Sequence, residues 1–173
     1  MEMSSIYFDS IKFSKLIESY GLKPQERIKN SEKYFAHTPP NDRDGEKESL
    51  VSHMKKVKET FLELVELHGL DGIVDKHINA LVSHDEINDK QKFYEFLKIL
   101  FFEAVHFHDI GKLNENYQIE KMGLVEHFGK QNNSIGSTHS NLSTFLFLAY
   151  MLEKLDMFQT DIEKGVAFIF ILL

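Results

Sequence analysis

A histidine and an aspartate stand side by side near the end of the most apolar segment of the chain, Ala104-Val-His-Phe-His-Asp-Ile-Gly-Lys112. Neighbouring positions on a helix differ by about 100°, so His108 and Asp109 can both point into one site. Imidazole supplies a neutral nitrogen ligand, and a carboxylate supplies charge and can bridge two ions. Without sulfur, this pair suits Mn, Fe, Co, Ni or Zn better than an all-oxygen magnesium site. Lys112, just past a glycine, can reach a phosphate oxygen.

A second His-Asp pair serves as an internal comparison. His84-Asp85 lies in a polar stretch and is followed by neither glycine nor lysine. We therefore expect it at a solvated helix end. The apolar helix before His108-Asp109 and the Gly-Lys after it distinguish that pair, although a buried histidine bonded to its neighbour is the structural alternative.

Two histidines elsewhere in the chain strengthen the prediction of a metal site. His53 borders an apolar helical stripe, where an imidazole needs a partner to offset its desolvation. His139 is expected in the first turn of a helix, where the helix dipole disfavours the imidazolium form and keeps a nitrogen free for metal. A hydrogen-bonded core histidine and a partly exposed helix-end histidine are the structural alternatives. Together with His108 and Asp109, these histidines are better explained by a shared metal site than by four unrelated structural roles.

The remaining histidines are expected outside the ligand set. His37 lies in a predicted Pro-rich loop and is a candidate for a supporting contact behind the ligands. His106 should face away from the site and pack, because it lies two residues before His108. The others are expected at helix ends, on the surface or in a turn: His68, His77, His84 and His127.

Helical periodicity dominates the elements that must position these residues. Apolar residues recur at steps of three and four, and strand signals are scarce. The pattern predicts an all-α fold of six or seven helices, at about residues 11–21, 25–35, 46–68, 72–83, 88–111, 138–152 and 160–170. Thr160 and Glu163 form a capping-box pattern at the last helix. Gly111 is expected to end its helix in a left-handed cap. Residues 37–45 are expected to be a loop, and residues 121–137 a long loop with at most one short turn of helix.

Composition excludes several classes of protein. The chain has 173 residues, no cysteine and a net charge of −7. Disulfide scaffolds, cysteine-ligated zinc and thiol nucleophiles are therefore excluded. Bulk charge would not attract nucleic acid or anionic lipid, so a phosphate-bearing substrate needs a local cationic centre. The longest apolar run, residues 166–173, is too short for a membrane helix, and with no signal peptide in view we expect a cytoplasmic protein.

The set of motifs resembles the HD superfamily of metal-dependent phosphohydrolases. More narrowly, it is similar to the HD nuclease domain of the CRISPR-associated type I helicase–nuclease. The resemblance spans about residue 34 to the end and rests on Ala36-His37, on Gly45, Leu50 and His53, on His108 to Lys112, on Tyr117-Gln118, and on His139 with Ser143 four residues on. It implies an HD-type helical bundle around a His/Asp metal site.

The resemblance also implies a ligand set. His53, His108 and Asp109 would hold one divalent transition metal, and Asp109 would bridge to a second ion shared with His139. Mn, Ni, Co, Fe or Zn would serve, with Mg also compatible. Two such ions activate a water and neutralise the leaving oxygen.

Catalytic and substrate contacts follow from the same resemblance. Asp109 and Lys112 would be catalytic, and Lys112 with Ser143 would contact the scissile phosphate. The function implied is a metal-dependent nuclease that degrades single-stranded DNA in CRISPR type I antiviral defence. Its partners would be a helicase domain or subunit and the RNA-guided surveillance complex. The alternatives are an HD phosphohydrolase acting on small nucleotides and a non-catalytic helical interaction module.

Two departures from the family concern the ends of the chain. The family's His-His-Gly segment and a later Asp, which complete the two metal shells, would be due after residue 173. We therefore expect residues 1–173 to be a single HD-type domain that forms an N-terminal fragment of a longer protein and has little activity alone. Residues 1–33 precede the usual family start and carry no assigned role.

Overall fold

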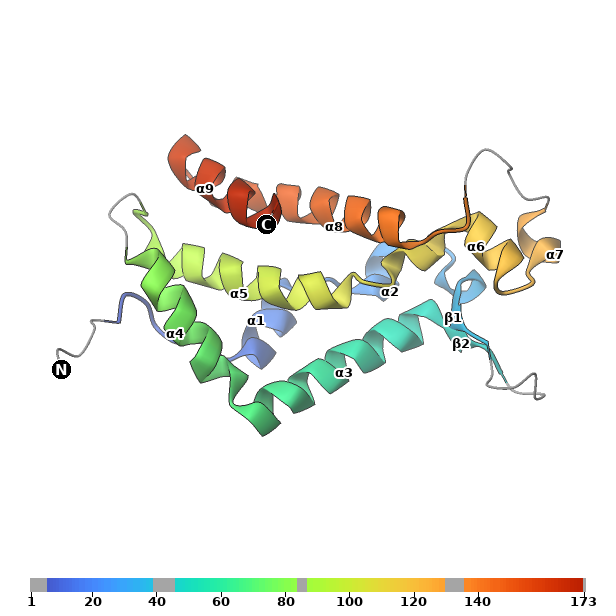
Figure 1. Ribbon diagram of the computed structural model, residues 1–173, viewed down its shortest axis with the longest axis horizontal. Coiled ribbons are helices and arrows are strands. Elements are labelled where there is room, and N and C mark those ends of the chain that lie inside the picture. The colour runs from blue at the N-terminus through green and yellow to red at the C-terminus, as the bar shows by residue number, and fades with distance from the viewer. Residues whose placement is uncertain (1–5, 39–45, 84–86, 130–135, 173) are drawn as a thin grey trace. The chain divides into compact units, whose positions relative to one another are not determined.

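The computed structural model describes residues 6–38, 46–83, 87–129 and 136–172. These residues are mainly helical, with one small two-stranded sheet, in agreement with the all-α prediction (Figure 1). The elements are α1 (Phe13–Tyr20), α2 (Pro24–Arg27), η1 (Ser31–Lys33), β1 (Phe35–His37), β2 (Glu48–Ser49), α3 (Leu50–His68), α4 (Leu70–Val82), α5 (Lys90–His106), η3 (Ile110–Leu113), α6 (Glu115–Glu120), α7 (Val125–Phe128), α8 (Ser140–Lys154), η4 (Leu155–Met157) and α9 (Asp161–Leu172), where η marks a 3-10 helix.

The chain divides into two compact units. The first comprises Met1–Leu22, Thr60–Glu103 and Leu148–Leu173, and the second comprises Lys23–Glu59 and Ala104–Phe147. Helices α3, α5 and α8 each contribute residues to both units. That residues 1–173 form a single HD-type domain stays a prediction.

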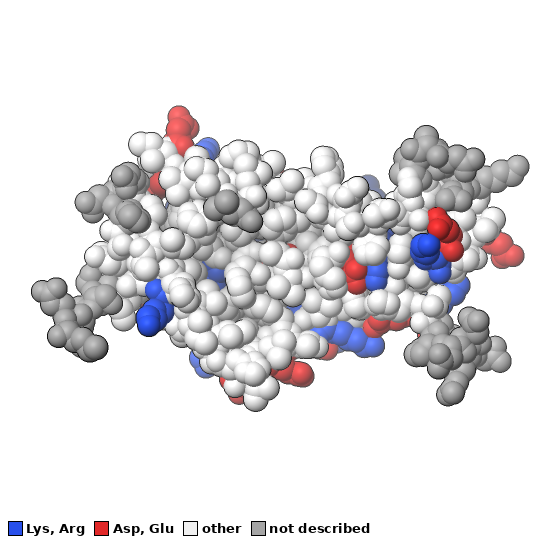
Figure 2. Space-filling view, in the orientation of Figure 1, with Lys and Arg blue, Asp and Glu red and all other residues white. Residues whose placement is uncertain are grey.

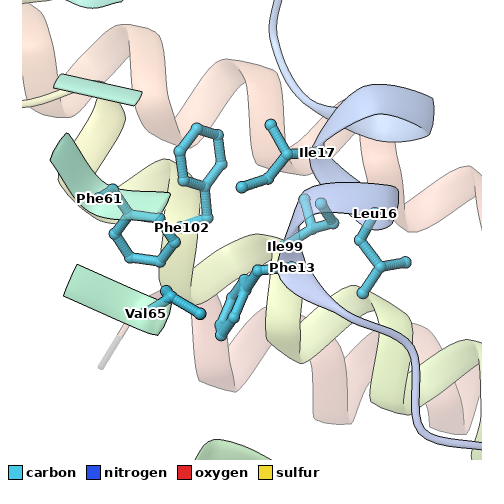
Figure 3. Close-up of a cluster of buried hydrophobic side chains, with 7 residues drawn as sticks. All are labelled: Phe13, Leu16, Ile17, Phe61, Val65, Ile99 and Phe102. Atoms are coloured by element: carbon cyan, nitrogen blue, oxygen red, sulfur yellow. The ribbon is translucent and has the colours of Figure 1, made fainter. Parts of the chain in front are cut away.

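A cluster of aromatic and aliphatic side chains forms the core of the first unit (Figure 3). It joins α1, α3 and α5 through Phe13, Leu16, Ile17, Phe61, Val65, Ile99 and Phe102. The rings of Phe13 and Phe61 meet edge to face with centroids 5.2 Å apart. Each buried side chain of this size stabilises the fold by about 1.5–3 kcal/mol, so the cluster is a main source of cohesion in this unit.

Side chains of α4 and α5 hold the segment before α1 through its backbone. The Ile11 amide donates to the Tyr94 hydroxyl (2.9 Å), and the Phe13 amide donates to Asp71 Oδ1 (2.9 Å). The ammonium of Lys98, which is fully buried, donates to the Ile11 carbonyl (2.7 Å) and pairs with Asp71 (2.7 Å). This N-terminal segment is therefore an integral part of the first unit.

The second unit begins with a short antiparallel hairpin. Strand β1 pairs with β2 through Phe35 opposite Ser49 and His37 opposite Glu48. The helix predicted over residues 25–35 is wrong. A left-handed Asn30 (φ 53°) separates α2 from η1, and the chain is already extended at β1.

The strand pairing also explains where α3 begins. The predicted helix over 46–68 starts at Leu50, because the two residues before it belong to β2. Of the predicted loop over 37–45, His37 lies in β1, and residues 39–45 lie outside the described part.

A smaller apolar cluster supports the hairpin within the second unit. It consists of Tyr117, Met122 and Leu124, with Phe35 and Phe128 packed against them. Three of these residues lie in or beside α6, a helix that the sequence analysis did not predict. The expected loop over 121–137 contains the one-turn helix α7, and its residues 130–135 lie outside the described part.

Two features of the surface bear on possible ligands. On the face shown in Figure 2, basic and acidic side chains are interspersed among the described residues, without a broad basic patch. No helix among the described residues combines the length and the apolar character needed to cross a membrane. On the face shown in Figure 2, a phosphate-bearing ligand would therefore depend on a local cationic site.

Candidate metal centre

The carboxylate of Asp109 gathers three histidines from separate parts of the second unit. Its Oδ2 atom lies 2.9 Å from His53 Nε2 and 3.2 Å from His108 Nε2. Its Oδ1 atom lies 3.3 Å from His139 Nε2. The structure therefore brings all four sequence-predicted ligands together, although more than eighty positions separate the first from the last.

Three different local structures present these residues. His53 lies in the first turn of α3. His108 and Asp109 lie in the turn between α5 and η3, because α5 ends at His106 and not at Gly111 as predicted. His139 directly precedes α8, and its carbonyl accepts the Ser143 amide (2.9 Å), as an N-cap residue does.

Gly111 has a different role from the one predicted. Its φ angle is not positive, so it is not a left-handed cap. An added Cβ would lie 1.9 Å from the His139 carbonyl oxygen and 2.5 Å from the Ser143 amide nitrogen. The glycine is required because the Asp109 turn packs directly against the backbone at the start of α8.

Two of the histidines are oriented through their other ring nitrogen. His53 Nδ1 lies 3.2 Å from Glu48 Oε2, and Lys56 pairs with Glu48 Oε1 at 2.7 Å. Burial would raise the pKa of Glu48, but Lys56 and His53 outweigh it and lower that pKa. His108 Nδ1 lies 2.8 Å from the carbonyl oxygen of Val105. Such contacts fix a ring so that its Nε2 atom is available as a ligand.

Asp109 is charged and buried. Its residue is only 7 % exposed, and the equally buried Lys112 donates a 2.9 Å hydrogen bond to Oδ2. Burial alone would raise the pKa of Asp109, but His53, Lys112 and the charge of His108 outweigh burial and hold that pKa well below its usual range. The centre thus keeps one permanent negative charge among nitrogen donors.

His37 is closer to the centre than the sequence indicated. Its ring meets that of His53 at a centroid distance of 4.7 Å. Ligand atoms of His37, His53 and Asp109 lie within 4.8 Å of one another, so this group could hold a metal ion. Desolvation and the charge of Lys112 lower the pKa of His37, which favours the neutral imidazole that a metal requires.

Pairs of donor atoms at the centre have the spacing that a divalent cation requires. Around one ion with bonds of about 2.1 Å, neighbouring donor atoms stand roughly 3.0–3.4 Å apart. Each contact of Asp109 with His53, His108 or His139 is close to that range. Among the described residues, His37, His53 and Asp109 form the group whose ligand atoms all lie within 4.8 Å of one another. In addition, the buried Nε2 atom of His53 has no hydrogen bond of acceptable direction, despite its short distance to Asp109. A buried polar atom left in this way is a ready metal ligand.

The two residues predicted to contact phosphate have different surroundings. The ammonium of Lys112 is buried beside Asp109 and lies 5.9 Å from the centre of the Tyr117 ring. The Ser143 hydroxyl is also buried and accepts a hydrogen bond from the Gly111 amide (2.8 Å). Their predicted contacts with a substrate stay predictions, and both side chains stabilise the Asp109 turn in the structure.

Two histidines predicted to lie outside the ligand set, His106 and His127, have the surroundings that the sequence predicts. His106 is buried and meets the Phe107 ring edge to face, and His127 is exposed on α7. His84 and Asp85 lie outside the described residues. Glu48 is a supporting residue that the sequence analysis missed, because only strand pairing brings it opposite His37.

A cavity of about 500 Å³ lies beside the centre, within the second unit. Two of its walls are His37 and His139, and among the described residues that line it none carries a carboxylate. The complete lining is Ala36, His37, Thr38, Tyr117, Lys121, Met122, Ser137, Thr138 and His139. Its volume is in the range of small-molecule sites, and hydroxyl groups and an ammonium supply hydrogen-bond donors.

No family model matches the chain, and no curated protein or solved structure is significantly similar to it. The resemblance to the HD superfamily stays a prediction from motifs.

Proposed function

We propose that the second unit is a metal-dependent phosphodiesterase of the HD type and that its substrate is single-stranded DNA. The observation that carries the proposal is the distribution of histidines around Asp109. His53 and His108 face one carboxylate oxygen, and His139 faces the other. This division supports one ion on each side of a bridging carboxylate, which is the arrangement that the motif resemblance implies.

The ligands would be His53, His108, Asp109 and His139, and the geometry adds His37 as a further candidate. A divalent transition ion bound there would polarise a phosphoryl oxygen and make a bound water more acidic. Nitrogen and oxygen donors without sulfur favour Mn, Ni, Co, Fe or Zn over Mg.

The chain's own residues would prepare the site for this chemistry. Glu48 orients the His53 ring, so that Nε2 faces Asp109. Lys112 holds the Asp109 carboxylate in place and adds positive charge where a phosphate would approach. Such preorganised charge acts strongly because it needs no rearrangement during the reaction.

The adjoining cavity supplies room for one nucleotide unit next to the centre. The hydroxyls of Thr38, Ser137 and Thr138 can donate to phosphate or sugar oxygens. Lys121 also lines the cavity, but it pairs with Glu120 at 2.8 Å and is half exposed, so its contribution to binding should be modest.

The motif resemblance supports the biological setting of the proposal. We place the activity in CRISPR type I antiviral defence in the cytoplasm. Partners would be a helicase domain or subunit and the RNA-guided surveillance complex, which together would deliver unwound DNA. The chain's negative net charge is compatible with this, because the ions and the partner can supply the positive field.

Two measurements test the proposal. Elemental analysis and calorimetric titration with Mn²⁺ should show measurable but weak binding by the purified chain, because two ligand motifs of the family are expected beyond residue 173, and Asp109→Ala should abolish it. The complete gene product should then cleave single-stranded DNA with Mn²⁺ or Ni²⁺, and Asp109→Ala should remove the cleavage. His127→Ala is the matched control, because His127 is an exposed histidine of the same unit and should change neither result.

The possible outcomes separate the alternatives. Metal binding with hydrolysis of mononucleotides and no cleavage of DNA would favour a small-nucleotide phosphohydrolase. Unchanged metal content in Asp109→Ala would support a non-catalytic helical module. Either result would overturn the proposed nuclease.

A further inference from the structure

A buried amide connects two parts of the candidate metal centre. Gln118, on α6, is fully buried. Its Nε2 atom donates to the Lys112 carbonyl (2.6 Å) and to the Phe35 carbonyl (2.9 Å), and its Oε1 atom accepts from the Phe35 amide (3.0 Å). Both donors and the acceptor of this one side chain are therefore used.

The bonded backbones belong to the two halves of the centre. Phe35 begins β1, the strand that carries His37 and pairs with Glu48. Lys112 belongs to η3, the turn that directly follows Asp109. Gln118 thus links the hairpin half, which supplies and orients histidines, to the turn that supplies the carboxylate.

Among the described residues, separate backbone contacts hold each half, and the side chain of His53 meets Asp109 between them. The hairpin is joined to α3 by the Leu50 amide, which donates to the Tyr34 carbonyl (2.9 Å). The Asp109 turn is joined to α8 by the bond from Gly111 to Ser143. Between the hairpin and the turn, Gln118 makes three bonds, and the Tyr117 hydroxyl adds a long one of 3.4 Å to the Ala36 carbonyl.

Only an amide of this length satisfies all three backbone groups. Glutamate has almost the same shape, but its carboxylate would face the two carbonyl oxygens without a proton to donate. Methionine has a similar length and would leave the buried Lys112 carbonyl and both half-buried Phe35 groups without this partner. In a buried site, each lost bond is costly and the backbones would move apart.

We infer that Gln118 is a positioning residue for the metal centre and fixes the separation between the His37–His53 side and Asp109. This inference rests on the proposed function, because it concerns the cation that the centre would bind. Gln118 itself would touch neither the ion nor the substrate. Residues behind metal ligands commonly change metal affinity by about 10–100-fold when they are replaced.

The test compares two variants with a matched control in the full chain. Gln118→Glu and Gln118→Met remove the link and keep the size of the side chain. Leu124→Ala is the control. Leu124 belongs to the apolar cluster that contains Tyr117, the neighbour of Gln118, but its side chain makes no hydrogen bond to either half of the centre. Mn²⁺ affinity is measured by calorimetry, the Co²⁺ coordination sphere by its visible spectrum, and folding by thermal melting.

We expect both Gln118 variants to bind Mn²⁺ at least about 10-fold more weakly and to change the Co²⁺ spectrum. Leu124→Ala should lower the melting temperature and leave affinity and spectrum unchanged. Native affinity and spectrum in both Gln118 variants would overturn this inference alone, as would unfolding of both, which would make the role purely structural. An unmodified chain that binds neither ion would overturn the proposed function and, with it, this inference.

Discussion

Replacing Asp109 by asparagine should destabilise the protein even without metal, because of the charges around this residue. Many metal centres gather several carboxylates, which repel one another when the ion is absent. Here one carboxylate faces three imidazoles and an ammonium. Asp109→Asn removes the only negative charge in contact with the buried Lys112 among the described contacts, so the apo protein loses an attraction.

The size of the effect follows from the distance and the burial. Lys112 Nζ lies 2.9 Å from Asp109 Oδ2. At an effective dielectric constant near 20, two unit charges at this distance attract with about 6 kcal/mol. Desolvation of both groups offsets part of this, and removing one partner of a buried pair typically costs about 3–5 kcal/mol. We expect Asp109→Asn and Lys112→Met each to lower the free energy of unfolding by that amount.

A double-mutant cycle measures the pair directly. The double variant should cost about 2–3 kcal/mol less than the two single variants added together, because no lone charge remains buried. Unfolding is induced by urea and followed by circular dichroism. EDTA removes bound cations, and pH 8 keeps imidazoles of ordinary pKa neutral. Additive effects within about 0.5 kcal/mol would refute the reasoning, because they would mean that the two groups do not interact.

The same pair predicts a pH dependence with a definite sign. The pKa of folded Asp109 lies below its ordinary value, despite burial, because of His53, Lys112 and His108. Its stabilising contribution is therefore complete above the ordinary carboxyl pKa of about 3.9 and is lost as the pH falls toward the lower folded value. The difference in unfolding free energy between the wild type and Asp109→Asn should shrink from pH 5 to pH 2, and a constant difference would contradict this.

Three further predictions follow from individual contacts. Gly111→Ala should weaken Mn²⁺ binding and lower the melting temperature, since its Cβ would overlap backbone atoms. Its control is Gly72→Ala in α4, where the added Cβ meets open space, and this change should be neutral or stabilising by up to about 1 kcal/mol. Tyr94→Phe should speed hydrogen exchange at the Ile11 amide, because that amide donates to the Tyr94 hydroxyl. Unchanged exchange, measured by mass spectrometry, would argue against the described attachment. Thr160→Ala should cost about 1 kcal/mol in urea unfolding, because its hydroxyl caps α9.

Local sequence signals predicted the helices where the physical cause is itself local. The capping box is confirmed at α9: the Glu163 amide donates to Thr160 Oγ1 (3.2 Å), and the Thr160 hydroxyl contacts Glu163 Oε2 (2.9 Å). At α5, Asn88 and Gln91 have the spacing of a capping box, but the cap lies one residue later, since Asp89 accepts the Lys92 amide (2.9 Å). Such contacts involve three consecutive positions and depend little on the rest of the fold.

Buried faces were predicted less well than the helices themselves. Along α3, the apolar residues Leu50, Met54, Val57, Phe61 and Leu64 recur at steps of three and four, which predicts one buried stripe. In the structure Leu64 is 43 % exposed, whereas Val65 is buried. On α8, the apolar pattern of Leu142, Phe145, Leu146 and Ala149 predicts a buried Phe145, but this side chain is 66 % exposed and Ser143 is buried. Periodicity shows that a helix has an apolar side, but the neighbouring elements decide which residues are covered.

The sequence by itself identified the chemistry of the candidate site, because histidine and aspartate types, their spacing and the apolar helix before them are all visible in one dimension. Tertiary structure alone decided the supporting set. His37 and Glu48 meet through strand pairing, Gly111 is required by a close approach to α8, and Gln118 bonds to a strand more than eighty positions away. The physical reason is that a ligand is recognised by its own donor atom, whereas a supporting residue is defined only by the groups that folding places against it.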